Sequence, residues 1–283
     1  MTTSLAELRA RHASNLAAQE SNKGGSKGKS DYASFIKGSN LVRFLPGADN
    51  PLDFYQTAHL HKYRDAEGNF KSYRCRKDSE EGNCPVCDLF WDLWKRHKAL
   101  NLGKDENGRI RKSNFGNMAT LIKAKPRFFA KAVIRQIQED QPDESPVKFV
   151  AMSQQLFDRA MEAILDEDYQ DEADPENTTI LSIERGNDFD IKLTDQGEFV
   201  SFSDSKAKVK KTRAGTPAEV AEWMDAPLDL STLTKPGTYD EAREIVQMLE
   251  SSLNTVGTDS KPSEASTDSD SESEDKFNEE LKA

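Results

Sequence analysis

Three features that define common classes of protein are scarce or absent in this sequence. Only three of its 283 residues are cysteine, too few and too unevenly spaced for a network of disulfides. No stretch approaches the roughly 18 consecutive apolar residues of a membrane-spanning helix, and the mean hydropathy is -0.78. The first residues lack the apolar run of a secretory signal. We therefore expect a cytoplasmic protein in a reducing compartment, with no role for a membrane.

The patterns of several enzyme classes are also missing. The sequence contains no G-x-x-x-x-G-K-[ST] phosphate-binding loop and no G-x-S-x-G nucleophile turn. Zinc deaminases show H-x-E followed by P-C-x-x-C, but here Lys62 and Tyr63 follow His61, and Asn83 precedes Cys84. The glutamate that would act as general base is absent, so we expect a protein that is not an enzyme.

The charge of the chain is segregated along its length. A net charge of -11 first argues against a nucleic-acid partner, because an acidic protein repels phosphates at long range. However, residues 61–135 hold 18 Lys and Arg against 9 Asp and Glu, whereas residues 136–200 hold 4 against 18. This distribution predicts separate basic and acidic functional faces. Ordinary solvated helix and loop surfaces are the alternative.

Composition divides the chain into three parts. In residues 1–30, apolar side chains at helical spacing predict a short amphipathic helix, and a Gly/Ser/Lys-rich linker follows it, so we expect a flexible N-terminal arm. Residues 31–253 have the composition of a folded core. Residues 254–283 are rich in Ser, Asp and Glu and poor in apolar side chains. Because such a segment cannot offset its ordering entropy, we expect a disordered acidic tail.

The core alternates short β-like runs with a few amphipathic helices. Runs rich in β-branched or aromatic residues, separated by turn residues, predict strands at 39–46, 53–61, 70–75, 117–124, 128–137, 178–186, 188–193 and 198–203. Helical spacing predicts helices at 89–100, 152–165 and 238–253. Many short strands with inserted helices favour a β-rich α+β fold, here an OB-fold core with a zinc-ribbon-like subdomain and peripheral helices.

The most specific local signal is a potential metal site. All three cysteines, Cys75, Cys84 and Cys87, fall in one short segment, and the C-P-V-C spacing lets two thiolates reach one ion. The turn at residues 65–69 folds the preceding strand back towards Cys75. His61, or else His59, would supply the fourth ligand, since alternate strand positions share a face. Four protein ligands leave no place for a reactive water, so we expect one structural zinc ion.

Basic and aromatic residues alternate around this site. Binding single strands without reading sequence needs cations that follow the phosphates and aromatic faces on which bases stack. The candidates are Phe70, Tyr73, Arg74, Arg76, Lys77, Arg109, Arg111, Lys112, Phe115, Lys123, Lys125, Arg127, Phe128, Phe129 and Arg135. Any one aromatic fits a β-barrel core equally well. The clustering with Arg and Lys is therefore what predicts a single-stranded nucleic-acid surface.

Three segments together resemble a known family. L-V-R-F-L-P at residues 41–46, the histidine with Cys75 and C-P-V-C, and R-K-S-N-F-G-N-M at residues 111–118 resemble the T-even-type bacteriophage single-stranded-DNA-binding protein family, the gene 32 protein family. The order of arm, zinc-bearing OB core and acidic tail is also similar. The segment at residues 188–206 resembles a late strand pair of that family, which implies that Phe199 and Phe202 line the DNA cleft.

The resemblance implies a function and partners. It implies cooperative, sequence-independent coating of single-stranded DNA during phage replication, recombination and repair in the cytoplasm of an infected bacterium. It also implies self-assembly through the arm, for which the residues are Leu5, Leu8, Arg9 and Arg11, and recruitment of replication and recombination proteins by the tail. The alternative is a zinc-finger adaptor or a regulator that binds duplex DNA, which would need a recognition helix.

Overall fold

The computed structural model describes residues 31–106, 108, 110–135, 146–172, 177–195, 200–225 and 228–255. The expected arm and acidic tail therefore lie outside the described residues, apart from the last turns of the C-terminal helix. Among the described helices, none is both long and apolar enough to cross a membrane.

The architecture is an antiparallel, curled sheet with helices around it, which confirms the expected β-rich α+β class. The strands are β1 (Gly38–Phe44), β2 (Tyr55–Arg64), β3 (Phe70–Arg74), β4 (Lys125–Ile134), β5 (Val147–Met152), β6 (Gly186–Asp195), β7 (Val200–Ser201) and β8 (Lys206–Thr212). Their order is β3-β2-β4-β1-β6-β7, with β5 paired to β4 and β8 paired to β6. Every one of these pairings is antiparallel.

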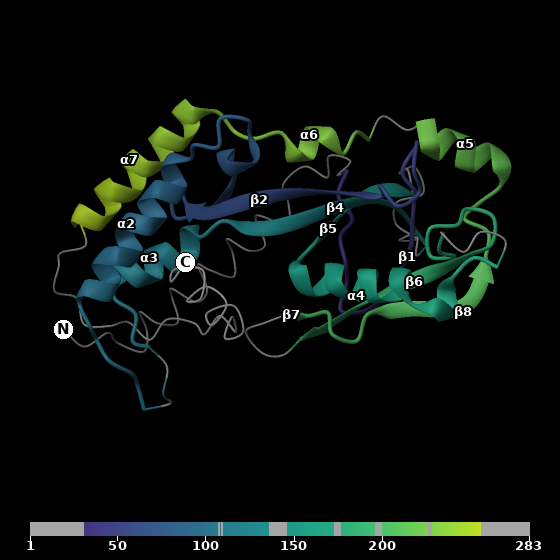
Figure 1. The fold of residues 1–283 in the computed structure, drawn as a ribbon, viewed down its shortest axis with the longest axis horizontal. Helices are drawn as coiled ribbons and strands as arrows, with labels where there is room; N and C mark the ends of the chain where they lie inside the picture. The colour runs from purple at the N-terminus through teal and green to yellow at the C-terminus, as the bar shows by residue number, and fades with distance from the viewer. Residues whose placement is uncertain are drawn as a thin grey trace, which may run out of the picture.

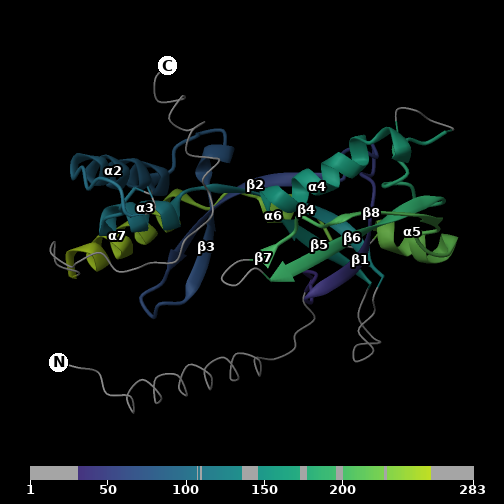
Figure 2. The ribbon, with the colours of Figure 1, turned by 90° about the horizontal axis from the view of Figure 1, so that it is seen from below.

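The helices divide between two ends of the molecule. They are α2 (Pro85–Ala99), α3 (Asn114–Ile122), α4 (Gln154–Leu165), α5 (Pro217–Asp225), α6 (Ser231–Thr234) and α7 (Tyr239–Thr255), with short 3-10 turns η1 (Arg76–Asp78) and η2 (Glu167–Tyr169). In Figure 1, α2, α3 and α7 gather at one end, and α4, α5, β6 and β8 at the other. The long strands β2 and β4 run between the two ends, and the view from below in Figure 2 agrees.

Strand β2 joins the two ends because it has two partners. Its first half, Tyr55–Leu60, pairs with β4 in the main sheet. Its second half, Leu60–Arg64, pairs with β3 in a hairpin. This hairpin closes through a turn in which the backbone N–H of Gly68 donates to the carbonyl oxygen of Asp65 at 3.0 Å, and Gly68 adopts a φ of 86°, which favours glycine. The hairpin therefore projects from the sheet towards the helical end.

The buried apolar residues of the described part form two large cores and two smaller clusters. The strand core consists of residues from β1, β4, β5, β6, β8 and α4, together with Phe54, Ile180 and Leu181. The helix core consists of residues from α2, α3 and α7 together with Tyr73, Cys75 and Cys84. Below, "strand half" and "helical half" mean the parts of the molecule built on these two cores.

The expectation of a strand at residues 117–124 is wrong. Most of this segment belongs to α3, because Ser113 caps the helix: its hydroxyl oxygen accepts from the backbone N–H of Gly116 at 3.2 Å. Ala119 and Ile122, at helical spacing, are completely buried in the helix core. The N-cap and the 3-4 spacing outweigh the β propensity of the apolar run.

The expected strand at residues 178–186 is also wrong, and two strands were not foreseen. Ile180 and Leu181 are buried, but turn hydrogen bonds use the local backbone, such as the one from the N–H of Leu181 to Thr178. An apolar run need not join a ladder if its polar groups are satisfied locally. Strands β5 and β8 were missed: β5 reads V-K-F-V-A-M, with one lysine and no clear alternation, and β8 reads K-A-K-V-K-K-T, with little apolar content.

Candidate metal centre and nucleic-acid surface

The hairpin and the start of α2 bring four potential metal ligands together. His61 lies on β2 opposite Tyr73 of β3, and Cys75 follows β3 directly. Cys84 is the N-cap of α2, with Pro85 as the first helical residue, and Cys87 lies in the first turn. Proline suits this position because the first helical residue needs no N–H partner. The local sequence therefore aims three thiols at the buried face of the hairpin.

The four ligand atoms have the spacing of a tetrahedral site. The Sγ atoms of Cys75 and Cys87 are 3.4 Å apart, and His61 Nε2 lies 3.4 Å from Cys84 Sγ and 3.6 Å from Cys87 Sγ. All four atoms lie within 4.8 Å of one another. Bonds of about 2.3 Å to sulfur and about 2.0 Å to nitrogen require separations of about 3.6–3.8 Å. The four residues can therefore bind one metal ion.

A second hydrogen bond orients the histidine. Nδ1 of His61 lies 2.6 Å from the carbonyl oxygen of Ile122, at the end of α3. A carbonyl only accepts, so Nδ1 bears a proton, and Nε2 is the nitrogen that faces the thiols and would bind a metal. The other candidate, His59, points away and pairs with Asp78 at 2.9 Å. Strand alternation left this choice open, and the tertiary structure places His61 in the cluster.

The cluster holds protons that a metal would displace. Burial lowers the pKa of His61, but hydrogen bonds to the Cys75 and Cys84 thiols and to Ile122 outweigh this effect and raise the pKa to about 9. Hydrogen bonds from Cys75 and Cys87 lower the pKa of Cys84. Cys87 has a raised pKa because it shares the same hydrogen bonds as the protonated partner. A divalent cation would displace these protons and bind the four ligand atoms directly.

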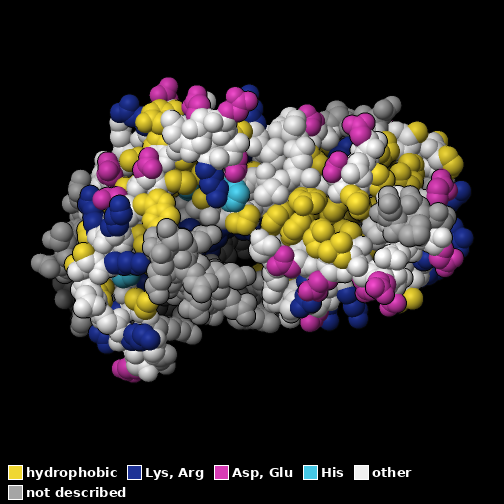
Figure 3. Space-filling view, viewed as in Figure 1, with side chains coloured by type: hydrophobic (Ala, Val, Ile, Leu, Met, Phe, Trp, Pro, Cys, Tyr) yellow, Lys and Arg dark blue, Asp and Glu magenta, His cyan; other side chains and the backbone are white. Residues whose placement is uncertain are grey.

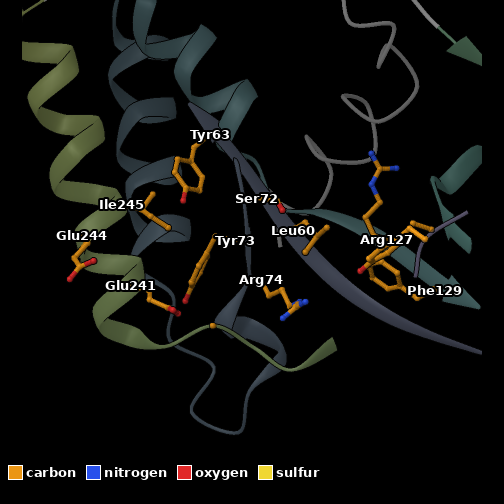
Figure 4. A pocket seen from close by; sticks show the side chains of 13 residues that line it. Leu60, Tyr63, Ser72, Tyr73, Arg74, Arg127, Phe129, Glu241, Glu244 and Ile245 are labelled. Carbon is orange, nitrogen blue, oxygen red and sulfur yellow. The ribbon is translucent and has the colours of Figure 1, made fainter. Parts of the chain in front are cut away.

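A pocket of about 610 Å³ lies between the two halves. One wall, called the strand side, consists of residues from β2, β3 and β4: Leu60, Arg74, Arg127 and Phe129. The other wall, the α7 side, consists of Glu241, Glu244 and Ile245. In Figure 4 the strand residues and the α7 residues lie on opposite sides of the view, with Tyr63 and Tyr73 near α7. Figure 3 shows the surface hollowed between the two halves, with Lys and Arg side chains on the helical half. The remaining lining residues are Tyr32, Ser72, Ala151 and Gly237.

Four of the expected DNA-binding residues meet in this pocket, although they come from two different strands. Arg74 and Tyr73 lie on β3, and Arg127 and Phe129 lie on β4. The rings of Tyr73 and Phe129 are each 5% exposed and pack in apolar clusters. The two arginines, both half-buried, are the cations of the pocket lining, while these two rings shape its walls.

Phe70 has a different environment from the pocket residues. It lies at the tip of the hairpin with 62% of its surface exposed. The guanidinium carbon of Arg64 lies 3.8 Å from the centre of its ring. The guanidinium covers one face of the ring, and most of the remaining surface of Phe70 is open to solvent.

Several other expected DNA contacts hold the structure together. Arg76 donates to the carbonyl oxygens of Asn83 and Gly237, each at 3.1 Å, and pairs with Glu81. Arg135 pairs with Asp188 at 2.9 Å. The aromatic members of this group, Phe115, Phe128 and Phe202, pack against the apolar cores.

The remaining candidates do not converge on the pocket. Lys77 and Arg111 are exposed, while Lys112, Lys123 and Lys125 are half-buried. The candidates outside the described residues are Arg109, Phe199, Leu5, Leu8, Arg9 and Arg11.

No local signal in the sequence indicated the α7 side of the pocket. Glu241 and Glu244 read as the solvent face of an ordinary amphipathic helix. Tyr63 could have been found, because it lies two residues after His61 and alternate strand positions share a face. His97 is buried, and its Nδ1 lies 3.0 Å from Ser113 Oγ, which ties α2 to the cap of α3.

The sequence matches a family model. The model described as "gp32 DNA binding protein like" matches residues 36–252, well over half of the chain. No curated protein matches the sequence. The matched range covers the whole metal cluster and the lining of the pocket except Tyr32. The chain therefore belongs to the gp32 DNA-binding-protein-like family, in agreement with the resemblance in its motifs.

Proposed function

We propose that this protein coats single-stranded DNA without reading its sequence and catalyses no reaction. The observation that supports this most directly is the pocket between the two halves, where Arg74 and Arg127 lie among aromatic side chains in a member of a DNA-binding family. Two cations on β3 and β4, the two strands that flank β2, can follow the phosphates of one flexible chain. Phe70, exposed at the hairpin tip, offers a stacking face beyond the pocket.

The strand half would act as an OB-type binding core and the helical half as a zinc-ribbon-like subdomain. The proposed metal is zinc, because three thiolates and one imidazole in a tetrahedral set are its usual structural ligands. His61, Cys75, Cys84 and Cys87 would hold it. When bound, zinc would fix the hairpin to α2, and with four protein ligands it would have no open position for catalysis.

The remaining parts of the proposal concern assembly. Residues 1–30 would dock on a neighbouring protomer and so make coating cooperative. Residues 254–283, with their acidic composition, would compete with DNA for the basic surface and recruit replication and recombination proteins. A tethered polyanion acts at high effective concentration, which supports this competition. These roles fit a protein that protects single strands during phage replication, recombination and repair.

A titration of labelled DNA tests the proposal. Fluorescence anisotropy would compare a poly-pyrimidine single strand with a duplex of equal length at several salt concentrations. We expect tighter binding of the single strand and affinity that falls steeply with salt. A preference for a particular duplex site would instead support the alternative, a regulator of double-stranded DNA.

Substitution of the pocket arginines localises the interaction. We expect Arg74→Ala and Arg127→Ala each to weaken binding and to reduce the slope of log affinity against log salt by about 0.7, as for one lost phosphate contact on a single strand. Arg185→Ala is the matched control, since Arg185 is exposed but lies outside the pocket. Unchanged slopes in both pocket variants would place the binding surface elsewhere.

A further inference from the structure

The pocket between the two halves has walls of opposite charge. Arg74 and Arg127 lie on the strand side, whereas Glu241 and Glu244 lie on α7. Figure 4 shows the two groups on opposite sides of Tyr73. Carboxylates in a site for a polyanion weaken binding, so their presence there needs a reason beyond affinity. The effect of these carboxylates on a bound nucleic acid depends on how firmly the two walls are held apart.

The α7 wall is fastened to the strand that bears Arg74. The backbone N–H of Gly237 donates to the carbonyl oxygen of Arg74 at 3.1 Å. The hydroxyl of Tyr73 donates to the carbonyl oxygen of Thr238 at 2.8 Å. A Cβ on Gly237 would lie only 2.2 Å from Cε2 of Tyr73. This close approach fixes the start of α7 against β3, and with it the distance between the walls.

Glu241, in the acidic wall, keeps its charge at neutral pH. Glu241 and Thr238 form a capping box, in which the Glu241 carboxylate accepts from the backbone N–H of Thr238 at 2.8 Å. The hydroxyl oxygen of Thr238 accepts in turn from the N–H of Glu241 at 3.2 Å. The hydrogen bonds from Thr238 lower the pKa of Glu241. Glu244, one helical turn further on, is exposed.

We propose that Glu241 and Glu244 restrict the pocket to nucleic acid with a single backbone. The proposal deepens the proposed function and rests on it. The phosphates of one strand face Arg74 and Arg127 while its bases turn towards α7. A double helix has a second backbone on the far side of its bases, and those phosphates face the two carboxylates. The acidic wall therefore determines specificity for single strands over duplex.

The two walls act unequally on single-stranded and double-stranded DNA. A duplex has one charge per about 1.7 Å of its axis, against about 3.4 Å for each strand. Like charges placed opposite each other suppress the wrong partner more than they weaken the right one. A cavity of about 610 Å³ is also in the size range of small-molecule sites, which leaves little room for the second backbone to move away from α7.

The test removes the negative charges of the acidic wall without disturbing the start of α7. The pocket variant is Glu241→Gln with Glu244→Gln, because glutamine also serves in a capping box. The control is Glu222→Gln with Glu250→Gln, which changes the net charge equally on exposed helix positions outside the pocket. Affinities for a labelled poly-pyrimidine strand and for a duplex of equal length are measured by anisotropy at several salt concentrations, and melting temperatures check the fold.

The ratio of the two affinities decides the outcome. In the pocket variant we expect the preference for single strands to fall by about three- to tenfold, mainly through tighter duplex binding, and in the control to change by less than about twofold. Equal gains for both forms of DNA, or an unchanged ratio, would overturn the inference. If the unmodified protein itself shows no preference for single strands, the proposed function fails as well. If the pocket variant keeps its preference for single strands, the role of the acidic wall is rejected but the proposed function is not.

Discussion

The strand half and the helical half bury their residues in different ways. The strand core contains 18 buried apolar residues. The buried polar side chains of this half have partners within the protein, as Arg43 has in the carbonyl oxygen of Gly186 at 2.7 Å. Stacked or tilted aromatic contacts, such as that of Phe128 on Phe157 at 3.7 Å between ring centres, tie the sheet to α4 and to its own strands. The helix core has 12 buried residues, of which two are cysteines, and it surrounds the buried side chain of His61.

This difference indicates how each half is stabilised. Apolar area removed from water stabilises the strand core in proportion to its size. In the helix core, polar ligands take the central place, and burying them costs free energy unless they have partners. A metal would supply those partners, so we expect the helical half to depend on the metal and the strand half to depend on packing.

Removal of the metal should have the largest effect. We expect Cys84→Ser to lower the free energy of unfolding of the helical half by more than about 5 kcal/mol, because loss of a structural metal removes binding energy that is also folding energy. Zinc content measured by elemental analysis should fall. Hydrogen exchange should show lost protection in α2, α3 and the β2–β3 hairpin, with protection retained in β4, β5 and β6.

His59→Ala is the control for that experiment. His59 points out of the cluster and makes only a surface pair with Asp78, so we expect a loss below about 1 kcal/mol and full zinc content. His61→Ala should behave like Cys84→Ser. Uniform loss of protection across both halves would show that the two cores do not differ as described.

A large-to-small change in the strand core should have the next largest effect. Phe189 on β6 is completely buried and lies 5.6 Å, centre to centre, from the ring of Phe44. We expect Phe189→Ala to cost about 3–5 kcal/mol, through lost transfer free energy and the cavity left behind. Chemical denaturation measures this loss. Zinc content should remain unchanged while the protein is folded, whereas release of zinc would show that the halves are stabilised jointly.

The smallest of these effects should come from the junction of the two halves. At Gly237 an added methyl group meets the Tyr73 ring, so we expect Gly237→Ala to cost about 1–3 kcal/mol as α7 shifts outward. Thermal melting measures this cost. Gly68→Ala is a useful comparison, because nothing lies within 4 Å of its added Cβ and only the positive φ opposes it. Equal shifts in both would show that the α7 contact is loose.

The metal cluster could be predicted almost completely from the sequence. The C-P-V-C spacing and the short distance to Cys75 are local, and a hairpin turn at residues 65–69 is enough to bring a histidine opposite. The choice between His59 and His61 could not be predicted, because alternation puts both on one face in principle. The twist of β2, together with the carbonyl of Ile122 at the end of α3, decides it.

For the candidate nucleic-acid surface, the sequence predicted only which residue types take part and not which side chains meet. Basic and aromatic residues in the first half of the core pointed to DNA, but Arg76 and Arg135 turned out to bridge backbone segments and an acid. Local patterns cannot separate such roles, because an arginine that fastens a loop and one that binds phosphate have the same sequence surroundings. The two kinds of arginine differ in the residues that surround them in space, and those residues come from other helices and strands.

The sequence by itself determined what depends on near neighbours in the chain. This includes the metal ligands, the amphipathic helices α2, α4 and α7, most of the long strands, and the segregation of charge. Only the tertiary structure decided what depends on distant segments. Tyr73 and Thr238, which are 165 residues apart, share the hydrogen bond that sets α7 against β3. Spacing and periodicity report only which side chains share a strand or helix face, so the pocket and its acidic wall required the folded chain.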